Sequence, residues 1–267
     1  MQGTASSQSM GEIPTRAVDI VFVVDTTLGH DSFLDSFRKN LPNFLSHIHD
    51  KLTSAESIFS ILRVKITWFR DFYSDGNEAY GESPFYYYPN EKGKINSFVS
   101  ALKCSGGGDL PESSLEALTL AMRSDFSQTG DFRNHFVILI TDEDAHRFED
   151  YTRLSKIALR QGRVPIQYPD HMPWDAGAFS DAWVNNDPNG FFSADTEHTK
   201  LDPMGKWLFF LTPACYPWDD MEVCLDRAAR IPVKMHGGCG DVDWEELEHY
   251  LSFTLDYYLE TNSTIDY

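Results

Sequence analysis

The fold is decided by the stretch Ala17-Val18-Asp19-Ile20-Val21-Phe22-Val23-Val24-Asp25-Thr26-Thr27-Leu28-Gly29-His30. Its apolar run is too continuous for a surface strand and is typical of a strand buried on both faces, as in a parallel sheet. The run ends at Asp25, and two hydroxyl residues follow. Because ligands bind at the carboxyl ends of strands in open α/β sheets, this pattern places Asp25 and Thr27 at a binding edge. Carboxylate and hydroxyl oxygens suit Mg2+ or Mn2+, although the same residue types also end strands and cap helices in plain turns.

Composition and charge limit the class of protein and its partners. The chain has 267 residues, of which 42% are hydrophobic and 14% aromatic, and this is enough for a packed core. The formal net charge is -19, with 41 acidic and 22 basic residues. Such an acidic chain is not expected to bind nucleic acid or an anionic membrane as its main partner.

The first residues and the cysteines predict the location. Residues 1–8 lack the basic start and apolar core of a signal peptide, and no apolar run approaches the roughly 18 residues of a membrane span. The four cysteines lack CxxC spacing, so reduced thiols are expected rather than zinc ligands or disulfides. These features predict a cytoplasmic protein without membrane contact.

Apolar strands alternate with amphipathic helices along most of the chain. The pattern predicts strands at 18–24, 62–69, 135–140, 207–213 and 231–235, with a short edge strand at 85–88. It predicts helices at 32–52, 94–102, 113–122, 148–161, 219–229 and 243–259. This alternation predicts one α/β domain at 15–260, with a doubly wound, mostly parallel central sheet flanked by helices on both faces. Residues 1–14 read as a flexible leader, 162–205 as an irregular insert and 261–267 as a frayed tail.

Three separate segments are predicted to meet at the carboxyl ends of the strands. They are Asp25 with Thr27, the loop Gly106-Gly107-Gly108-Asp109-Leu110-Pro111-Glu112, and Ile140-Thr141-Asp142. In this order they resemble the von Willebrand factor A family, whose metal-ion-dependent adhesion site reads D-x-S/T-x-S, then Thr or Asp on a second loop, then Asp after the fourth strand. The glycine-rich loop looks like the GGGDxPE variant of some intracellular members. The resemblance implies a Rossmann-like fold and Mg2+, or Mn2+ or Ca2+, held by Asp25, Thr27, Asp109 and Asp142.

The sequence departs from that pattern at Gly29, where the family has Ser. One hydroxyl ligand is therefore missing, and water would have to replace it, which Mg2+ tolerates. The alternative is a site that has become a purely structural turn. Glu112 is expected to contact the ion through water or to favour the start of the next helix, and Glu143 to add negative potential at the rim or to be solvated. His30 is expected to be incidental at the start of a helix.

The resemblance implies a non-enzymatic protein-binding module. A metal with an open coordination position would accept an Asp or Glu from a protein partner, possible systems being those of AAA+ ATPases or of Ser/Thr kinases and phosphatases. One alternative is a metal-independent scaffold with a degenerate site. Another is an Asp-dependent phosphatase of the haloacid dehalogenase kind, but Thr27 stands where that chemistry needs a second Asp. The insert at 162–205 and the tyrosine-rich strand at 85–88 are the expected specificity elements.

Overall fold

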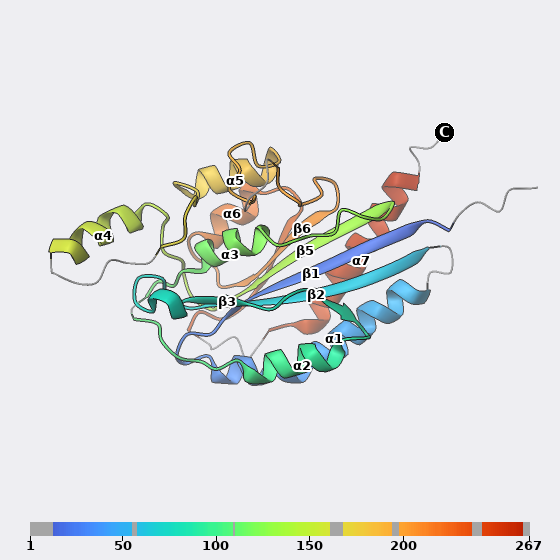
Figure 1. Ribbon diagram of the computed structural model, residues 1–267, viewed down its shortest axis with the longest axis horizontal. Coiled ribbons are helices and arrows are strands. Elements are labelled where there is room, and N and C mark those ends of the chain that lie inside the picture. The colour runs from blue at the N-terminus through green and yellow to red at the C-terminus, as the bar shows by residue number, and fades with distance from the viewer. Residues whose placement is uncertain are drawn as a thin grey trace, which may run out of the picture.

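A computed structural model of the chain describes residues 13–54, 58–108, 110–160, 168–193, 198–236 and 242–263. These residues form a mixed, mostly parallel sheet of seven strands with helices packed against it (Figure 1). The predicted α/β class is confirmed. The leader at 1–12 and the end of the tail at 264–267 lie outside the described residues, and helix α7 continues to Ser263.

The sheet is built around β1 (Thr15–Asp25), the strand that contains the apolar run. It pairs in parallel with β2 (Phe59–Phe69) on one side and β5 (Phe132–Ile140) on the other. The sheet order is β3-β2-β1-β5-β6-β7, and the remaining strands are β6 (Lys206–Thr212), β7 (Ala228–Pro232), β3 (Tyr80–Glu82) and β4 (Tyr86–Tyr88). Strands β3 and β4 both pair antiparallel with β2, and β4 confirms the predicted edge strand. The carboxyl ends of the five parallel strands therefore share one edge.

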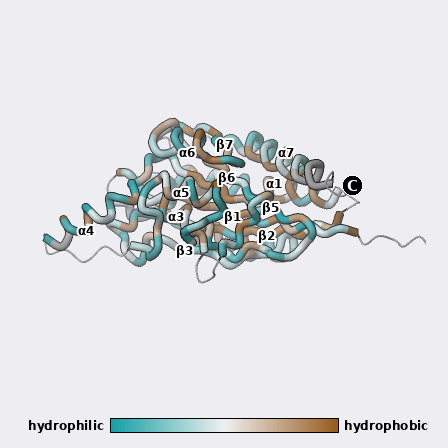
Figure 2. Tube along the Cα trace, turned by 90° about the horizontal axis from the view of Figure 1, so that it is seen from above, coloured by the Kyte–Doolittle hydropathy of each residue, from teal (hydrophilic) through white to brown (hydrophobic). Residues whose placement is uncertain are grey.

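Helices cover both faces of the sheet (Figure 1). One face carries α1 (Asp31–Ser54), α2 (Lys92–Ala101) and α7 (Trp244–Ser263), and the other carries α3 (Ser114–Met122), α5 (Ala176–Val184) and α6 (Trp218–Cys224). Alternate residues of β1 enter the two apolar clusters. Figure 2 shows hydrophobic segments within the body of the molecule. Burial on both faces explains why the run that forms β1 shows no polar alternation. Helix α4 (Asp150–Arg160) projects away from this body, and η1 (Gly76–Glu78) is a short turn before β3.

Two local predictions differ from the structure. The helix predicted at 219–229 ends at Cys224, because Leu225 is extended and 228–232 pairs with β6 as strand β7. Pairing with a distant strand outweighs local helix propensity there. The strand predicted at 231–235 is β7, which begins at Ala228 and ends at Pro232. Helix α1 continues through Pro42, which lies on its exposed side.

The predicted insert is only partly described. Residues 161–167 and 194–197 lie outside the described residues, and α5 forms between them. Asp175 caps α5, because its side chain accepts a hydrogen bond from the Ala178 backbone N–H at 2.7 Å. None of the helices that the structure describes is long and apolar enough to span a membrane.

Candidate functional site at the carboxyl ends of β1 and β5

Asp25 ties the end of β1 to the end of β5. Its side chain is fully buried. Oδ1 accepts hydrogen bonds from the Thr27 backbone N–H at 2.9 Å and from the Thr27 hydroxyl at 2.7 Å. Oδ2 accepts a hydrogen bond from the Thr141 hydroxyl at 2.7 Å. Asp25 therefore caps its own turn, which is the alternative that the sequence left open, and also holds two neighbouring strands together.

The glycine-rich loop packs directly on this turn. The Leu28 N–H donates to the Gly106 carbonyl at 3.2 Å, and the Ser105 N–H donates to the Thr26 carbonyl at 3.0 Å. Gly107 has a φ of +73°, and a Cβ there would lie 3.1 Å from Glu112 Oε1. Such close approach in the left-handed region explains the glycine. The loop, the β1 turn and the end of β5 thus meet as predicted, whereas Asp109 lies outside the described residues.

His30 lies at the centre of this group. Its Nε2–H donates to Asp142 Oδ1 and is 3.7 Å from Asp25 Oδ2, and its Nδ1 is 3.1 Å from the Thr27 hydroxyl. Burial by itself lowers the pKa of the imidazole, but the hydrogen bond to Asp142 and the charges of Asp25 and Asp142 raise it more, to about 9. His30 is therefore positively charged at neutral pH and offsets part of the negative charge. Sequence reasoning treated it as incidental.

Two further carboxylates face the same region. Glu112 is buried, and its Oε2 has no hydrogen-bond partner among the described residues. Burial and the charge of Asp25 raise its pKa to about 9, so it is protonated at neutral pH. Glu143 is also buried, which excludes the solvated alternative, and its Oε1 lies 2.7 Å from His236 Nδ1. Burial raises the pKa of Glu143, against the opposing effect of His236.

A second buried polar cluster lies beside this site and was missed by sequence reasoning. Glu116, on α3, is fully buried, and its Oε1 accepts a hydrogen bond from the Tyr168 hydroxyl at 2.7 Å. Burial raises the pKa of Glu116 to about 7. Asp71 accepts hydrogen bonds from the Tyr73 N–H at 2.8 Å and from the Ser113 hydroxyl at 3.2 Å. The available signal was Glu116 itself, a single acidic residue in an otherwise apolar helix.

As they are arranged, the described candidate ligands do not fit a divalent ion. The His30 ring takes the position between Asp25 and Asp142 where such an ion would contact both carboxylates. No group of three or more His, Cys, Asp and Glu side chains among the described residues is placed to hold a metal. Gly29 has a φ of +107°, so the serine of the adhesion motif would be strained at this position. The roles of Asp25, Thr27, Asp109 and Asp142 as individual ligands stay predictions.

Comparisons with known proteins identify similar structures but no sequence family. No protein-family model matches the chain, and no curated protein sequence matches it. The PilB minor pilin from Streptococcus sanguinis superposes with a TM-score of 0.53 at 12% identity, covering 92% of this chain and 63% of that chain. The pilus adhesin SpaC from Lactobacillus rhamnosus GG gives a TM-score of 0.47 at 12% identity, covering 89% of this chain and 31% of that one. The chain therefore spans less than two thirds of the minor pilin whose fold it shares.

These findings correct three predictions from sequence. The shared fold is that of a pilin, so the assignment to the von Willebrand factor A family is contradicted, and so is the function of a metal-ion-dependent adhesion module. The cytoplasmic location is contradicted as well, because the solved structure that shares this fold is that of a minor pilin. The prediction of a metal-dependent adhesion site failed for a physical reason. An Asp-Thr turn after a buried strand is a common structural turn, and Asp25 makes the contacts of such a turn.

Proposed function

We propose that the chain is a non-enzymatic, protein-binding component of a cell-surface pilus. The observation that carries this proposal is the fold shared with a minor pilin over 92% of the chain. The helices on both faces of the mostly parallel sheet also support the doubly wound arrangement expected from the sequence. The net charge of -19 favours a protein partner over nucleic acid.

The face that best suits a partner is formed by α4 and residues 168–174. Helix α4 projects from the body (Figure 1), and a groove of about 610 Å³ runs between it and this segment. Tyr151 stacks on Tyr168 with ring centroids 4.0 Å apart, and 59% of Trp174 is exposed. Aromatic side chains are enriched in protein interfaces, because they bury much area at little entropic cost.

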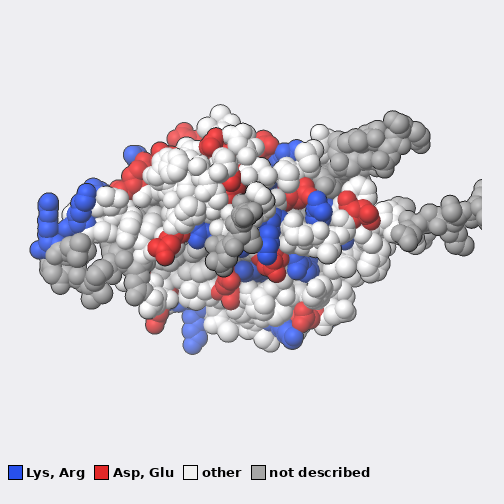
Figure 3. All heavy atoms as spheres, turned by 45° about the horizontal axis from the view of Figure 1, so that its top comes forward, with Lys and Arg blue, Asp and Glu red and all other residues white. Residues whose placement is uncertain are grey.

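The charge of this face indicates the chemistry of the partner. Arg153, Lys156 and Arg160 are exposed along α4, beyond the acidic Glu149 and Asp170 that line the groove, although the chain as a whole is strongly acidic. Figure 3 shows Lys and Arg side chains at the projecting end of the molecule. We therefore propose a partner segment that presents acidic side chains to α4 directly. This proposal keeps the acidic partner expected from the sequence, but it assigns the recognition of that partner to basic side chains instead of a metal ion.

The location is tested by fractionating cells of the native host. Surface appendages are sheared from intact cells and probed with an antibody against the purified chain, with a cytosolic enzyme as the marker of lysis. The proposal expects the chain to copurify with the appendages. Recovery with the cytosolic marker alone would overturn it.

The face is tested with purified appendages in a binding assay. The double variant Arg153→Glu with Lys156→Glu reverses two charges on α4 and is expected to weaken binding at least tenfold. The control variant Lys39→Glu with Lys94→Glu makes the same charge change on α1 and α2, where both lysines are exposed, and should bind like the parent. Equal losses in both variants would show that general charge, rather than α4, governs binding.

A further inference from the structure

His30 contacts the polar side chains of β1 and β5 that face one another. The same ring reaches Asp142 and Thr27, and its Nε2 is 3.7 Å from Asp25 Oδ2. The side chains of His30, Asp25 and Asp142 are all at most 6% exposed. The ring therefore fills an enclosed position between two carboxylates that come from different strands.

The backbone fixes the ring in this position. The His30 N–H donates to the Thr27 carbonyl at 3.4 Å, and the His30 carbonyl accepts the Leu34 N–H at 3.0 Å at the start of α1. Gly29, with its φ of +107°, lets the chain turn so that the next side chain points inward. Gly29 and His30 thus act together. The residue that departs from the adhesion motif is the one that allows the histidine to reach Asp142.

With the His30 ring in place, the site offers a metal ion few free oxygen atoms and little space. Both oxygens of Asp25 already accept hydrogen bonds, two from Thr27 and one from Thr141. An ion such as Mg2+ needs oxygens at about 2.0–2.1 Å in near-octahedral geometry. His30 Nε2, which is hydrogen-bonded to Asp142 and lies close to Asp25, occupies the space that this geometry requires.

Another observation shows that the enclosure is still polar enough for a cation. Glu112 is 4% exposed, and its Oε2 has no hydrogen-bond partner among the described residues. Its Oε1 and the Thr27 side chain both lie next to Gly107. A buried carboxyl group without a partner near the charge of Asp25 is costly to the fold. Removing the ring would leave these oxygens facing one another.

We propose that the His30 side chain is a built-in substitute for a divalent cation, which excludes metal from the wild-type site and holds the ends of β1 and β5 together in its place. The wild-type chain therefore binds no divalent ion between Asp25 and Asp142. A variant with a small side chain at position 30 binds one.

The test is titration with Mn2+, followed by calorimetry and by electron paramagnetic resonance of the free ion. The proteins are the wild type, His30→Ala, His30→Ser and His30→Ala with Asp142→Asn. The proposal expects no specific site in the wild type, one Mn2+ bound at least tenfold more tightly by His30→Ala and His30→Ser, and loss of that site in the double variant. Mg2+ is expected to compete for it.

A matched control is His135→Ala. His135 is also fully buried on β5, but it lies toward the amino end of the strand, where its Nδ1 accepts the Asp202 N–H at 2.9 Å. Its removal is expected to create no metal site. Mn2+ binding by this variant as tight as that of His30→Ala would overturn the proposal.

Two other results would overturn the proposal. One is an Asp142-dependent Mn2+ site in the wild type that is as tight as the site in His30→Ala. The other is the absence of binding in a folded His30→Ala or His30→Ser protein. A variant that folds only with Mn2+ supports the proposal. If both variants stay unfolded, the titration of the wild type decides. Specific, Asp142-dependent Mn2+ binding by the wild type would contradict the proposal, and the absence of such binding would support it.

Discussion

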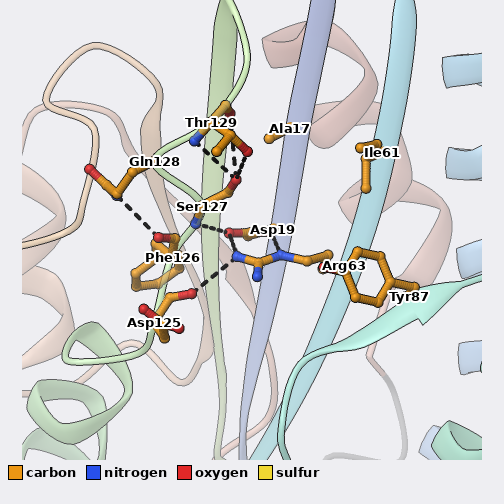
Figure 4. A pocket seen from close by; sticks show the side chains of 10 residues that line it. All are labelled: Ala17, Asp19, Ile61, Arg63, Tyr87, Asp125, Phe126, Ser127, Gln128 and Thr129. Atoms are coloured by element: carbon orange, nitrogen blue, oxygen red, sulfur yellow. Dashed lines mark hydrogen bonds and ion pairs between the residues drawn. The ribbon is translucent and has the colours of Figure 1, made fainter.

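Strand β1 buries an aspartate near each end, and the two are neutralised in different ways. Asp19, toward the amino end, accepts hydrogen bonds from Arg63 Nε at 2.7 Å and from an Arg63 terminal nitrogen at 2.6 Å, with a third from the Ser127 N–H at 2.7 Å (Figure 4). Asp25, at the carboxyl end, has hydroxyl groups, one backbone N–H and the His30 ring.

The difference concerns the permanence of the positive charge. A guanidinium stays protonated at every relevant pH and matches a carboxylate with two parallel hydrogen bonds. An imidazolium can lose its proton within the range in which proteins are studied. The amino end of β1 therefore carries a fixed ion pair beside a cavity of about 350 Å³, whereas the carboxyl end depends on pH.

The largest effect is expected from breaking the fixed pair. Arg63→Met leaves the Asp19 carboxylate buried without its counter-charge, which is expected to lower the free energy of unfolding by about 3–5 kcal/mol. Urea unfolding at pH 7 measures this loss. Adding Asp19→Leu removes the stranded charge and should restore most of the stability. A loss below about 1 kcal/mol in the single variant would contradict the comparison.

The next effect concerns pH at the other end of β1. The pKa of His30 is raised to about 9 in the folded protein, against about 6.5 in an unfolded chain. The folded state therefore binds this proton more tightly, so its stabilisation is complete below about pH 6.5 and is lost as the pH rises through about 9. The difference between the two pKa values corresponds to a loss of about 3 kcal/mol in the free energy of unfolding. Urea unfolding between pH 6 and pH 10 should show the decline.

His30→Asn is the control for this titration. It keeps a hydrogen-bonding side chain but cannot carry the charge, so the variant should be less stable at pH 6.5 and should lose less stability above it. Equal pH dependence in the parent and the variant would show that another group is responsible.

A smaller effect of opposite sign is expected at Glu112. Its pKa is about 9 in the folded protein against about 4.3 in an unfolded chain, so folding at pH 8 requires uptake of a proton. Glu112→Gln removes that requirement but buries an amide, and the net result is expected to be a gain of about 2 kcal/mol at pH 8. The gain should vanish below about pH 4. Differential scanning calorimetry at pH 8 and at pH 4 measures this gain in stability.

The smallest effect sets the scale for exposed pairs. Arg153 and Asp150 are 2.9 Å apart on α4, but the Arg153 side chain is 67% exposed. Arg153→Ala is expected to change the free energy of unfolding by less than about 0.5 kcal/mol. Urea unfolding in parallel with Arg63→Met gives the contrast directly, and a larger loss would mean that α4 is needed for the fold.

Much of the fold could be predicted because burial leaves a pattern in the sequence. Strands β1 and β5 are buried on both faces, so their residues form continuous apolar runs that end at polar side chains. The start of strand β7 could not be predicted: the sequence indicates a helix to residue 229 and a strand at 231–235, whereas pairing with β6 defines the strand as Ala228–Pro232.

The location of the candidate site could be predicted from the sequence, but the presence of the His30 side chain in it could not. The meeting of Asp25, Thr27 and Asp142 follows from parallel strands ending at one edge. The role of His30 depends on the φ of Gly29 and on the direction in which α1 begins, and neither can be read from residue types. The step from three short motifs to a family was wrong, since each motif is also a sufficient structural turn.

The two outer margins of the sheet have a consequence for assembly. On one side β2 is covered by the short strands β3 and β4, and on the other β7 carries Arg230, bound to Asp219 and Glu222, and ends at Pro232, which has no N–H to donate. Short, charged and proline-ended margins hinder a second chain from adding a strand. Polymerisation by continuation of the sheet is therefore disfavoured.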